Sequence, residues 1–246
     1  MTSQDEHKVM IKIRNLRKSF GENHVLHGFD MDLYEGENLV IMGKSGSGKS
    51  VMIKCLMGLM QPEAGEIQIM GRNVMELKHQ ELDQLRKEIG FLFQGSALYD
   101  SMTVRENLEF PLRKQSFNRE EKNHLVHKAL ESVGLIDAVD LMPAELSGGM
   151  KRRIALARAI ILSPKIIIYD EPTTGLDPIT AKEIIQLMRD IQNIHGSSAL
   201  IITHDVDCSR VIADRMILLI DGINYVEGSF DQLSTAEDHK IQAFFK

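Results

Sequence analysis

A phosphate-binding pattern near the start of the chain limits the folds that this sequence can adopt. The apolar residues 39–42 lead into Gly43-Lys44-Ser45-Gly46-Ser47-Gly48-Lys49-Ser50, and an apolar helical pattern follows. Glycines let consecutive backbone N–H groups turn toward one point, and a helix start adds unpaired N–H groups and the positive end of its dipole. The spacing G-x-x-x-x-G-K-[ST] therefore predicts a phosphate loop between a strand and a helix, rather than a simple Gly/Ser-rich turn.

Two side chains at the end of this loop have predicted roles in binding a nucleoside triphosphate. Lys49 supplies a positive charge for the β- and γ-phosphates, and the Ser50 hydroxyl is a ligand for Mg²⁺. The 246 residues are enough for one large α/β domain or two closely joined subdomains.

Composition argues against several other classes of protein. A hydrophobic content of 43% and a charged content of 26% are typical of a soluble globular protein, and a net charge of −6 disfavours nucleic-acid binding through charge alone. Cys55 and Cys208 match no metal or redox spacing, so we expect two small buried side chains in a reducing compartment. The polar N-terminus and the short apolar runs predict neither a secretion signal nor a membrane span. We therefore expect a protein that is cytosolic or held at a membrane by a partner.

The apolar pattern predicts an α/β core with an antiparallel layer. Alternation predicts strands with one wet face at 9–13, 25–33 and 66–70, whereas continuous apolar runs predict buried parallel strands at 39–42 and 165–171. We expect further strands at 89–93 and 198–203 and a hairpin at 217–220 and 224–227. Helices are expected at 78–88, 180–195, 205–216 and 236–245.

Residues 95–162 have a helical pattern and are expected to form an insertion in this core. One helix is predicted to begin at Thr103, an N-cap with Glu106 three residues later, and a second at Asn118. A third is predicted to open at Ser147.

An acidic pair ends the strand predicted at 165–171. The carboxyl ends of parallel strands line the ligand crevice of such sheets, so Asp170 and Glu171 are candidates for catalysis rather than a merely charged strand end. One carboxylate can orient the Mg²⁺ shell through water, and the next can take a proton from attacking water.

The segment Ser147-Gly148-Gly149 is a second candidate anion site, because it opens a predicted helix. One chain has no use for two γ-phosphate sites around one nucleotide. The simplest arrangement is a head-to-tail pair of chains, in which each phosphate loop faces the Ser-Gly-Gly segment of the other. A helix start capped by serine is the structural alternative.

These motifs together resemble the nucleotide-binding domain of ABC transporters. In chain order they are the phosphate loop, Gln94, Leu146-Ser147-Gly148-Gly149, Asp170-Glu171, Asp177 and His204. The resemblance covers nearly the whole chain and implies an α/β P-loop NTPase of the ABC ATPase type, with a mixed sheet core, an antiparallel β layer and a helical insertion subdomain. It implies one domain, with residues 1–94 and 163–246 as the nucleotide-binding core and residues 95–162 as the helical signature subdomain.

The resemblance implies that ATP and Mg²⁺ bind to this chain. Phe20 is expected to stack on adenine, and Ser147, Gly148 and Gly149 to contact the ATP of a second copy in an ATP-sandwich dimer. The residues expected to hold the phosphates are Gly43, Lys44, Ser45, Gly46, Ser47, Gly48, Lys49 and Ser50.

The same resemblance implies how hydrolysis is catalysed. Gln94 is expected to contact Mg²⁺ and the attacking water and to sense a membrane partner. Asp170 is expected at the metal, with Glu171 as the general base. Asp177 is expected to link the two sites of the dimer, and His204 to contact the γ-phosphate.

One residue departs from the common ABC signature. Met150 follows the two glycines where many ABC signatures have Gln, and its side chain cannot donate the amide hydrogen bonds of Gln. Segments 92–98, 110–113, 141–150 and 177–180 are similar to the ATPase subunit of Mla-type (MCE-system) phospholipid transporters of bacteria. That similarity implies a multi-spanning permease and a membrane-anchored MCE-domain lipid-binding protein as partners, with the chain at the cytoplasmic face of the bacterial inner membrane and lipid moved between the inner and outer membranes.

Other functions of an ABC ATPase stay open on sequence alone. The same motifs would serve lipoprotein release, cell division or solute import. A soluble ABC-type ATP clamp acting on DNA, ribosomes or cluster assembly belongs to a different class. Its usual long coiled coil, fused second domain or basic arm is not seen in this sequence, so no nucleic-acid partner is expected. For the permease, the apolar loop residues Ala97, Leu98, Tyr99 and Met102 are candidate contacts, with burial against the chain's own helices as the alternative.

Overall fold

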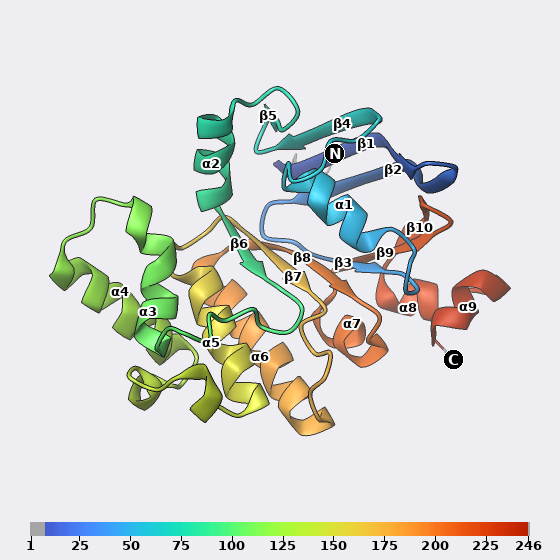
Figure 1. Cartoon of the computed structure of the whole chain (residues 1–246). Helices are drawn as coiled ribbons and strands as arrows, with labels where there is room; N and C mark the ends of the chain where they lie inside the picture. The colour runs from blue at the N-terminus through green and yellow to red at the C-terminus, as the bar shows by residue number, and fades with distance from the viewer. Residues whose placement is uncertain (1–7, 246) are drawn as a thin grey trace, which may run out of the picture. The chain divides into compact units, whose positions relative to one another are not determined.

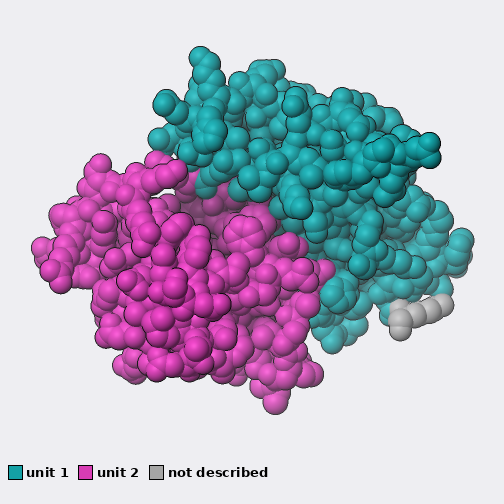
Figure 2. Space-filling view, in the orientation of Figure 1, with its two compact units in different colours: residues 1–86, 197–246 teal, residues 87–196 magenta. Residues whose placement is uncertain are grey.

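The computed structural model describes residues 8–245, and the chain divides into two compact units. Unit 1 comprises residues 1–86 and 197–246, and unit 2 comprises residues 87–196 (Figure 2). The phosphate loop belongs to unit 1, and the Ser-Gly-Gly segment and the acidic pair belong to unit 2.

Unit 1 contains an antiparallel sheet with the strand order β2-β1-β4-β5. Its strands are β1 (Val9–Phe20), β2 (Asn23–Tyr34), β4 (Ala64–Ile69) and β5 (Arg72–Asn73). In β1, Ile11 and Ile13 are buried whereas Lys12 between them is less so, as alternation requires. The three alternating strands predicted from sequence are confirmed, although β1 continues well beyond Ile13 (Figure 1).

The second sheet of unit 1 is mixed, with the order β10-β9-β3-β8 among its own strands. Its strands are β3 (Asn38–Met42), β8 (Ser198–Thr203), β9 (Arg215–Ile220) and β10 (Ile223–Gly228). β3 pairs in parallel with β8 and β9, whereas β10 returns antiparallel to β9. Every residue of β3 and β8 is buried, which explains their continuous apolar sequence.

The helices of unit 1 correct two predictions. They are α1 (Lys49–Leu56), α7 (Val206–Ile212), α8 (Phe230–Ser234) and α9 (His239–Phe245), and α2 (His79–Lys87) ends at the unit boundary. The helix predicted at 205–216 is wrong beyond Ile212, because Met216 pairs with Val40 in the sheet. The terminal helix begins at His239 rather than at residue 236, because α8 ends at Ser234 and residues 236–238 form an irregular link between the two helices.

Unit 2 contains the parallel pair β6 (Ile89–Leu92) and β7 (Ile166–Asp170) with a group of helices. The α-helices are α3 (Val104–Glu109), α4 (Arg119–Ser132), α5 (Gly148–Ile160) and α6 (Pro178–His195). Short 3₁₀ turns cover Phe110–Lys114, Ile136–Ala138 and Pro143–Glu145. The capping box predicted at Thr103 and Glu106 is confirmed, and Asn118 caps α4.

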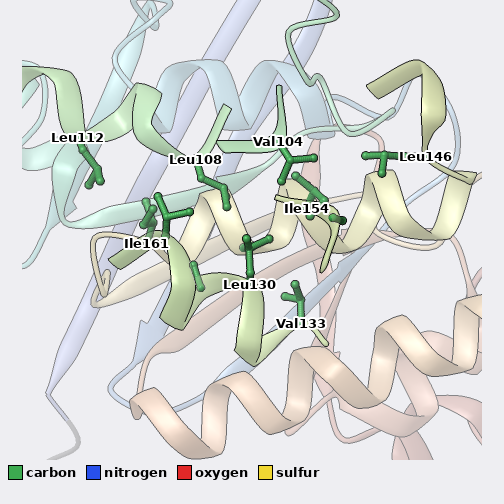
Figure 3. Packing of buried hydrophobic residues seen from close by; sticks show 12 residues of the cluster. Val104, Leu108, Leu112, Leu130, Val133, Leu146, Ile154 and Ile161 are labelled. Carbon is green, nitrogen blue, oxygen red and sulfur yellow. The ribbon is translucent and has the colours of Figure 1, made fainter. Parts of the chain in front are cut away.

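A core of aliphatic side chains holds the helices of unit 2 together. Val104 and Leu108 of α3, Leu130 of α4 and Ile154 of α5 are buried against one another (Figure 3). Their burial, rather than the helical propensity of short segments, stabilises this part of the chain.

Cys55 and Cys208 are both buried, as expected, and form no disulfide bond with each other. Over residues 8–245, no helix is long and apolar enough to cross a membrane.

Candidate nucleotide-binding site

The phosphate loop joins β3 to α1, as predicted. Gly46 and Gly48 have positive φ angles of 82° and 104°, which favour glycine. Gly43 has no room for a side chain, because an added Cβ would lie 2.5 Å from Ser47 Oγ and 3.0 Å from the carbonyl oxygen of Leu219. The glycine positions therefore follow from the backbone path of the loop.

The start of α1 is open to an anionic ligand. Gly48 is its N-cap and provides no side-chain acceptor, and the first turn holds no acidic residue. The leading N–H groups of the helix thus keep their hydrogen-bonding capacity for ligand oxygens. Lys44, Ser45 and Gly46 are exposed along the same loop.

Lys49 and Ser47 fit a loop built around phosphate groups. The Lys49 ammonium donates hydrogen bonds to the carbonyl oxygens of Gly43 and, at 3.0 Å, Lys44, so its charge lies along the loop. Ser47 Oγ is buried and lacks a hydrogen-bond partner among the described residues. A positive charge and an unsatisfied hydroxyl beside open N–H groups are suited to a polyphosphate chain.

A cavity of about 610 Å³ adjoins this loop in unit 1. Its walls come from residues 44–47, the start of β2, the turn between β9 and β10, and α9. Val25 and Gly222 meet at one wall, where an added Cβ on Gly222 would lie 2.5 Å from the Val25 carbonyl oxygen. The C-terminal helix is a wall element that the motifs did not indicate.

Phe20 and His204 are the other candidates in unit 1. Phe20 ends β1, its side chain is 48% exposed, and the Lys18 ammonium lies 5.5 Å from its ring centroid. An exposed ring of this kind is available for stacking. His204 is exposed directly after β8, beside the N-cap of α7.

Gln94 lies exposed just beyond β6 in unit 2, and the apolar loop that follows has a mixed environment. Leu98 packs on the helical core, whereas Tyr99 is 42% exposed and stacks on Phe110 with ring centroids 4.6 Å apart. The side-chain oxygen of the buried Asn107 accepts the Tyr99 N–H, and its side-chain nitrogen donates to the Tyr99 carbonyl oxygen. Leu98 is therefore packed against the chain's own helices, whereas the rings of Tyr99 and Phe110 are exposed on the surface.

Asp170 and Glu171 end β7 in unit 2 as predicted, and Glu171 has an unusual backbone. Its φ is 51°, a left-handed conformation that non-glycine residues rarely adopt. Only 8% of the residue is exposed, and Thr174 Oγ1 donates a hydrogen bond to its carboxylate at 3.1 Å. Strain of this kind persists where the surroundings hold it and is found at functional sites.

The Ser-Gly-Gly segment begins α5, also in unit 2. The Ser147 hydroxyl accepts the Met150 N–H, so the segment is a capped helix start. Nothing lies near a Cβ added to Gly148, but one added to Gly149 would lie 2.7 Å from Thr180 Cγ2. Gly149 therefore allows α5 to approach the first turn of α6.

Asp177 is the N-cap of α6 and fixes that same threonine. Its carboxylate accepts the backbone N–H groups of Ile179 and Thr180 and the Thr180 hydroxyl, at 3.0, 3.0 and 2.6 Å. The hydrogen bond from the Thr180 side chain lowers the pKa of Asp177 from its ordinary value. Capping is thus the role that this geometry gives to Asp177.

The motifs also missed Arg152, a buried cation on α5. Its guanidinium donates to the carbonyl oxygens of Phe93 and Thr174, and burial lowers its pKa. In sequence it is one basic residue in the run 151–153, and nothing in that pattern separates an exposed lysine or arginine from a buried one.

Each unit thus contains part of the predicted set. Unit 1 holds the phosphate loop, Phe20 and His204, and unit 2 holds Gln94, the Ser-Gly-Gly segment, the acidic pair and Asp177. Of the residues proposed for Mg²⁺, Ser50 belongs to unit 1 and Gln94 and Asp170 to unit 2.

The sequence of the chain is similar to a known family and to several characterised proteins. Residues 26–174 match the family model described as ABC transporter. The methionine import ATP-binding protein MetN of Rhizobium etli is 39% identical over 219 residues, which cover 89% of this chain and 61% of MetN. The intermembrane phospholipid transport system ATP-binding protein MlaF of Haemophilus influenzae is 37% identical over 238 residues, which cover 96% of this chain and 90% of MlaF.

A similar solved structure is a dimeric, post-hydrolysis state of the ATP-binding cassette MJ0796 bound to ADP and Pi. It has a TM-score of 0.81 and 34% identity, and the match covers 90% of this chain and 99% of that one.

Proposed function

The chain belongs to the ABC transporter family, and from that premise we propose that it is the ATP-hydrolysing motor subunit of a membrane transporter that moves phospholipids between the bacterial inner and outer membranes. The observation that carries the ATPase assignment is the phosphate loop. Its glycines have no room for side chains or need positive φ, and the helix start behind it is uncapped by any side chain. Such a loop is suited to the phosphates of ATP.

In this proposal the residues of the chain divide the work of hydrolysis. Lys49 and the N–H groups of the loop stabilise negative charge on the phosphates, and His204 contacts the γ-phosphate. Glu171 takes a proton from the attacking water, which Gln94 helps to orient. Ser50, Asp170 and Gln94 are the residues that would hold Mg²⁺, and the bound ion would neutralise charge on the phosphate oxygens.

The proposed cargo is supported by the extent of one comparison. MlaF matches this chain along nearly the full length of both proteins, whereas the chain spans 61% of MetN. The identities are close to each other, so the mutual coverage is what favours phospholipid over methionine. Solute import is the competing cargo class, favoured by the methionine import relatives; lipoprotein release and cell division are weaker alternatives.

The proposed partners follow from the same function. A second copy of the chain completes an ATP-sandwich dimer, as the dimeric cassette MJ0796 suggests. A multi-spanning permease contacts the exposed aromatic pair Tyr99 and Phe110 and recruits the chain to the cytoplasmic face of the inner membrane. An MCE-domain lipid-binding protein, anchored in the membrane, receives or delivers the lipid.

One experiment tests the function and the cargo together. The tagged chain is purified from membranes with its partners, which are identified by mass spectrometry, and the complex is assayed for ATPase activity. We expect a permease with an MCE-domain protein, ATP hydrolysis that Lys49→Ala abolishes, and altered phospholipid distribution after deletion of the gene. Co-purification with a periplasmic solute-binding protein would refute the phospholipid assignment, and an inactive complex would refute the motor.

A second experiment tests the general base. Glu171→Gln should leave ATP binding intact and slow turnover by about 10²–10⁴-fold, the usual effect of losing a general base. Unchanged turnover in the purified complex would show that another group takes the proton.

A further inference from the structure

Arg152 is a buried cation to which the proposed mechanism of hydrolysis assigns no role. It lies in the second turn of α5 and is only 3% exposed. Among the described residues no carboxylate forms an ion pair with it, and Nε has no hydrogen-bond acceptor. Burying a charge without a counter-ion costs free energy of folding. A buried arginine at this position therefore indicates that its hydrogen bonds serve a purpose that a smaller apolar residue could not serve.

The guanidinium joins two distant segments of unit 2 through their backbones. Nη1 donates to the Phe93 carbonyl oxygen at 3.2 Å, and Nη2 donates to the Thr174 carbonyl oxygen at 3.0 Å. Phe93 directly precedes Gln94 at the end of β6. Thr174 lies three residues after Glu171, in the turn that follows β7. One side chain therefore contacts both segments that carry candidate catalytic residues of this unit.

The contact at Thr174 reaches the Glu171 carboxylate through a single residue. Thr174 Oγ1 donates to Glu171 Oε2 at 3.1 Å, and the Thr174 N–H donates to the Glu171 carbonyl oxygen at 3.3 Å. Glu171 has the left-handed φ of 51°, so this turn needs external support to keep its shape. Arg152 holds the residue that closes the turn.

A second arginine on the same helix holds the loop after Gln94. Arg158 donates to the Ser96 carbonyl oxygen at 3.3 Å, and its guanidinium lies 5.8 Å from the Tyr99 ring centroid. The loop that presents Tyr99 is thus attached to α5, the helix on which Arg152 lies.

We propose that Arg152 is a positioning residue for ATP hydrolysis, which fixes the Glu171 turn and the backbone at Gln94 in one arrangement. The inference rests on the proposed function, because it assumes that both residues act on the attacking water. A displacement of the Gln94 backbone then changes the support of Thr174, and with it the position of the general base.

The shape of the guanidinium explains why arginine suits this position. Its planar fork places two N–H donors at a fixed separation, so it can serve two carbonyl oxygens at once. Lysine has one ammonium on a flexible stem and can serve one of them well. Methionine has a similar length and no donor.

The kinetic test uses Arg152→Met and Arg152→Lys in the purified complex. Loss of the support should lower kcat by about 10–100-fold in Arg152→Met, the effect of a small misplacement of a catalytic group, with the Kd for ATP within about threefold of wild type. Arg152→Lys should recover part of the loss. A folded Arg152→Met variant with wild-type kcat overturns the proposal, as does an equal loss of kcat and ATP affinity.

Arg86 offers a matched control. Its Nε and Nη2 both donate to the Met57 carbonyl oxygen at 3.1 and 2.9 Å, and its Nη1 pairs with Asp83 at 3.3 Å. Arg86→Met therefore removes these guanidinium–carbonyl bonds and this ion pair in unit 1. It should lower the Tm while leaving kcat within about twofold of wild type. If both variants lose activity in proportion to Tm, Arg152 is a stabilising residue only.

A second measurement does not depend on hydrolysis. Hydrogen–deuterium exchange of the full chain should show faster exchange in Arg152→Met at two separate segments, 94–99 and 172–176, with α6 beyond its first turn unchanged. Exchange that stays the same at either segment overturns the proposed support. Arg152→Met could exchange faster at both segments while the wild-type complex hydrolyses no ATP. That combination would refute the motor function and leave the link between the two segments intact.

Discussion

At the scale of single residues, the motifs located the phosphate loop between a strand and a helix but could not give the packing of individual side chains. The spacing of the phosphate loop requires glycine at residues 43 and 48, and the structure supplies the reason at each. The cap at Thr103 was predictable because a capping box is local in sequence. The buried state of Arg152 was not, because it depends on carbonyl oxygens 59 and 22 residues away.

The two glycines after Ser147 give a matched pair of substitutions. Gly149→Ala brings a Cβ within 2.7 Å of Thr180, which should destabilise the protein by about 1–3 kcal/mol through overpacking. Gly148→Ala meets nothing within 4 Å and should leave stability nearly unchanged. Urea unfolding of both variants measures the difference, and equal midpoints would mean that α5 and α6 adjust freely.

Asp177 predicts a specific pH dependence of stability. Its pKa is lowered from the ordinary value of 3.8 by the Thr180 hydrogen bond, so the carboxylate stabilises the folded state above pH 3.8. That contribution is lost as the pH falls through the lowered pKa. Asp177→Asn should be less stable than wild type at neutral pH, and the difference should shrink below pH 3.8 in urea titrations. A difference that is constant with pH would contradict the assignment.

At the scale of elements, the strands and long helices were predictable and the short C-terminal elements were not. β3 and β7 are buried apolar runs, and α4 and α6 carry their own caps. The prediction failed at Met216 because the sequence there suits a helix locally, while pairing with β3 draws it into the sheet. α8 has five residues, too few for a periodic pattern.

The helix α9 should depend on one buried side chain. It has seven residues, too few for a stable isolated helix, and Ile241 is its one buried residue. Ile241→Ala should therefore release α9 locally, with rapid amide exchange over residues 239–245 and little change in β3. Lys240→Ala, at an exposed position, is the control. Slow exchange of α9 in Ile241→Ala would show that the Phe230–Phe245 contact holds the helix by itself.

At the scale of the whole molecule, the sequence predicted the family but left open the cargo and the boundaries between the units of the chain. The motif set identifies the ABC transporter family because each of its members is expected to act around one ligand, ATP. The relatives named for methionine and for phospholipid transport have similar identity to the chain, so identity alone does not separate the two cargoes. The division of the chain at residues 86 and 196 differs from the core and insertion proposed from sequence, which stay a proposal.

Dimer formation is a prediction at this scale. If Glu171→Gln binds ATP without rapid turnover, as the proposed function predicts, it should elute with ATP and Mg²⁺ at twice the 27.8 kDa mass of one chain. Lys49→Ala, which weakens the binding of the phosphates, should remain at 27.8 kDa under the same conditions. Light scattering after size-exclusion chromatography distinguishes the two masses, and a monomeric Glu171→Gln variant saturated with ATP would contradict the sandwich.

The left-handed backbone at residue 171 has a consequence for how this protein changes over generations. Glycine accepts a φ of 51° without the crowding that a Cβ meets there, so Glu171→Gly relieves strain while deleting the carboxylate. Selection for stability then favours glycine at position 171, whereas selection for turnover favours glutamate. Under the proposed function, a gene copy that no longer hydrolyses ATP is free to drift to glycine at 171, whereas a hydrolysing copy must retain the strained glutamate.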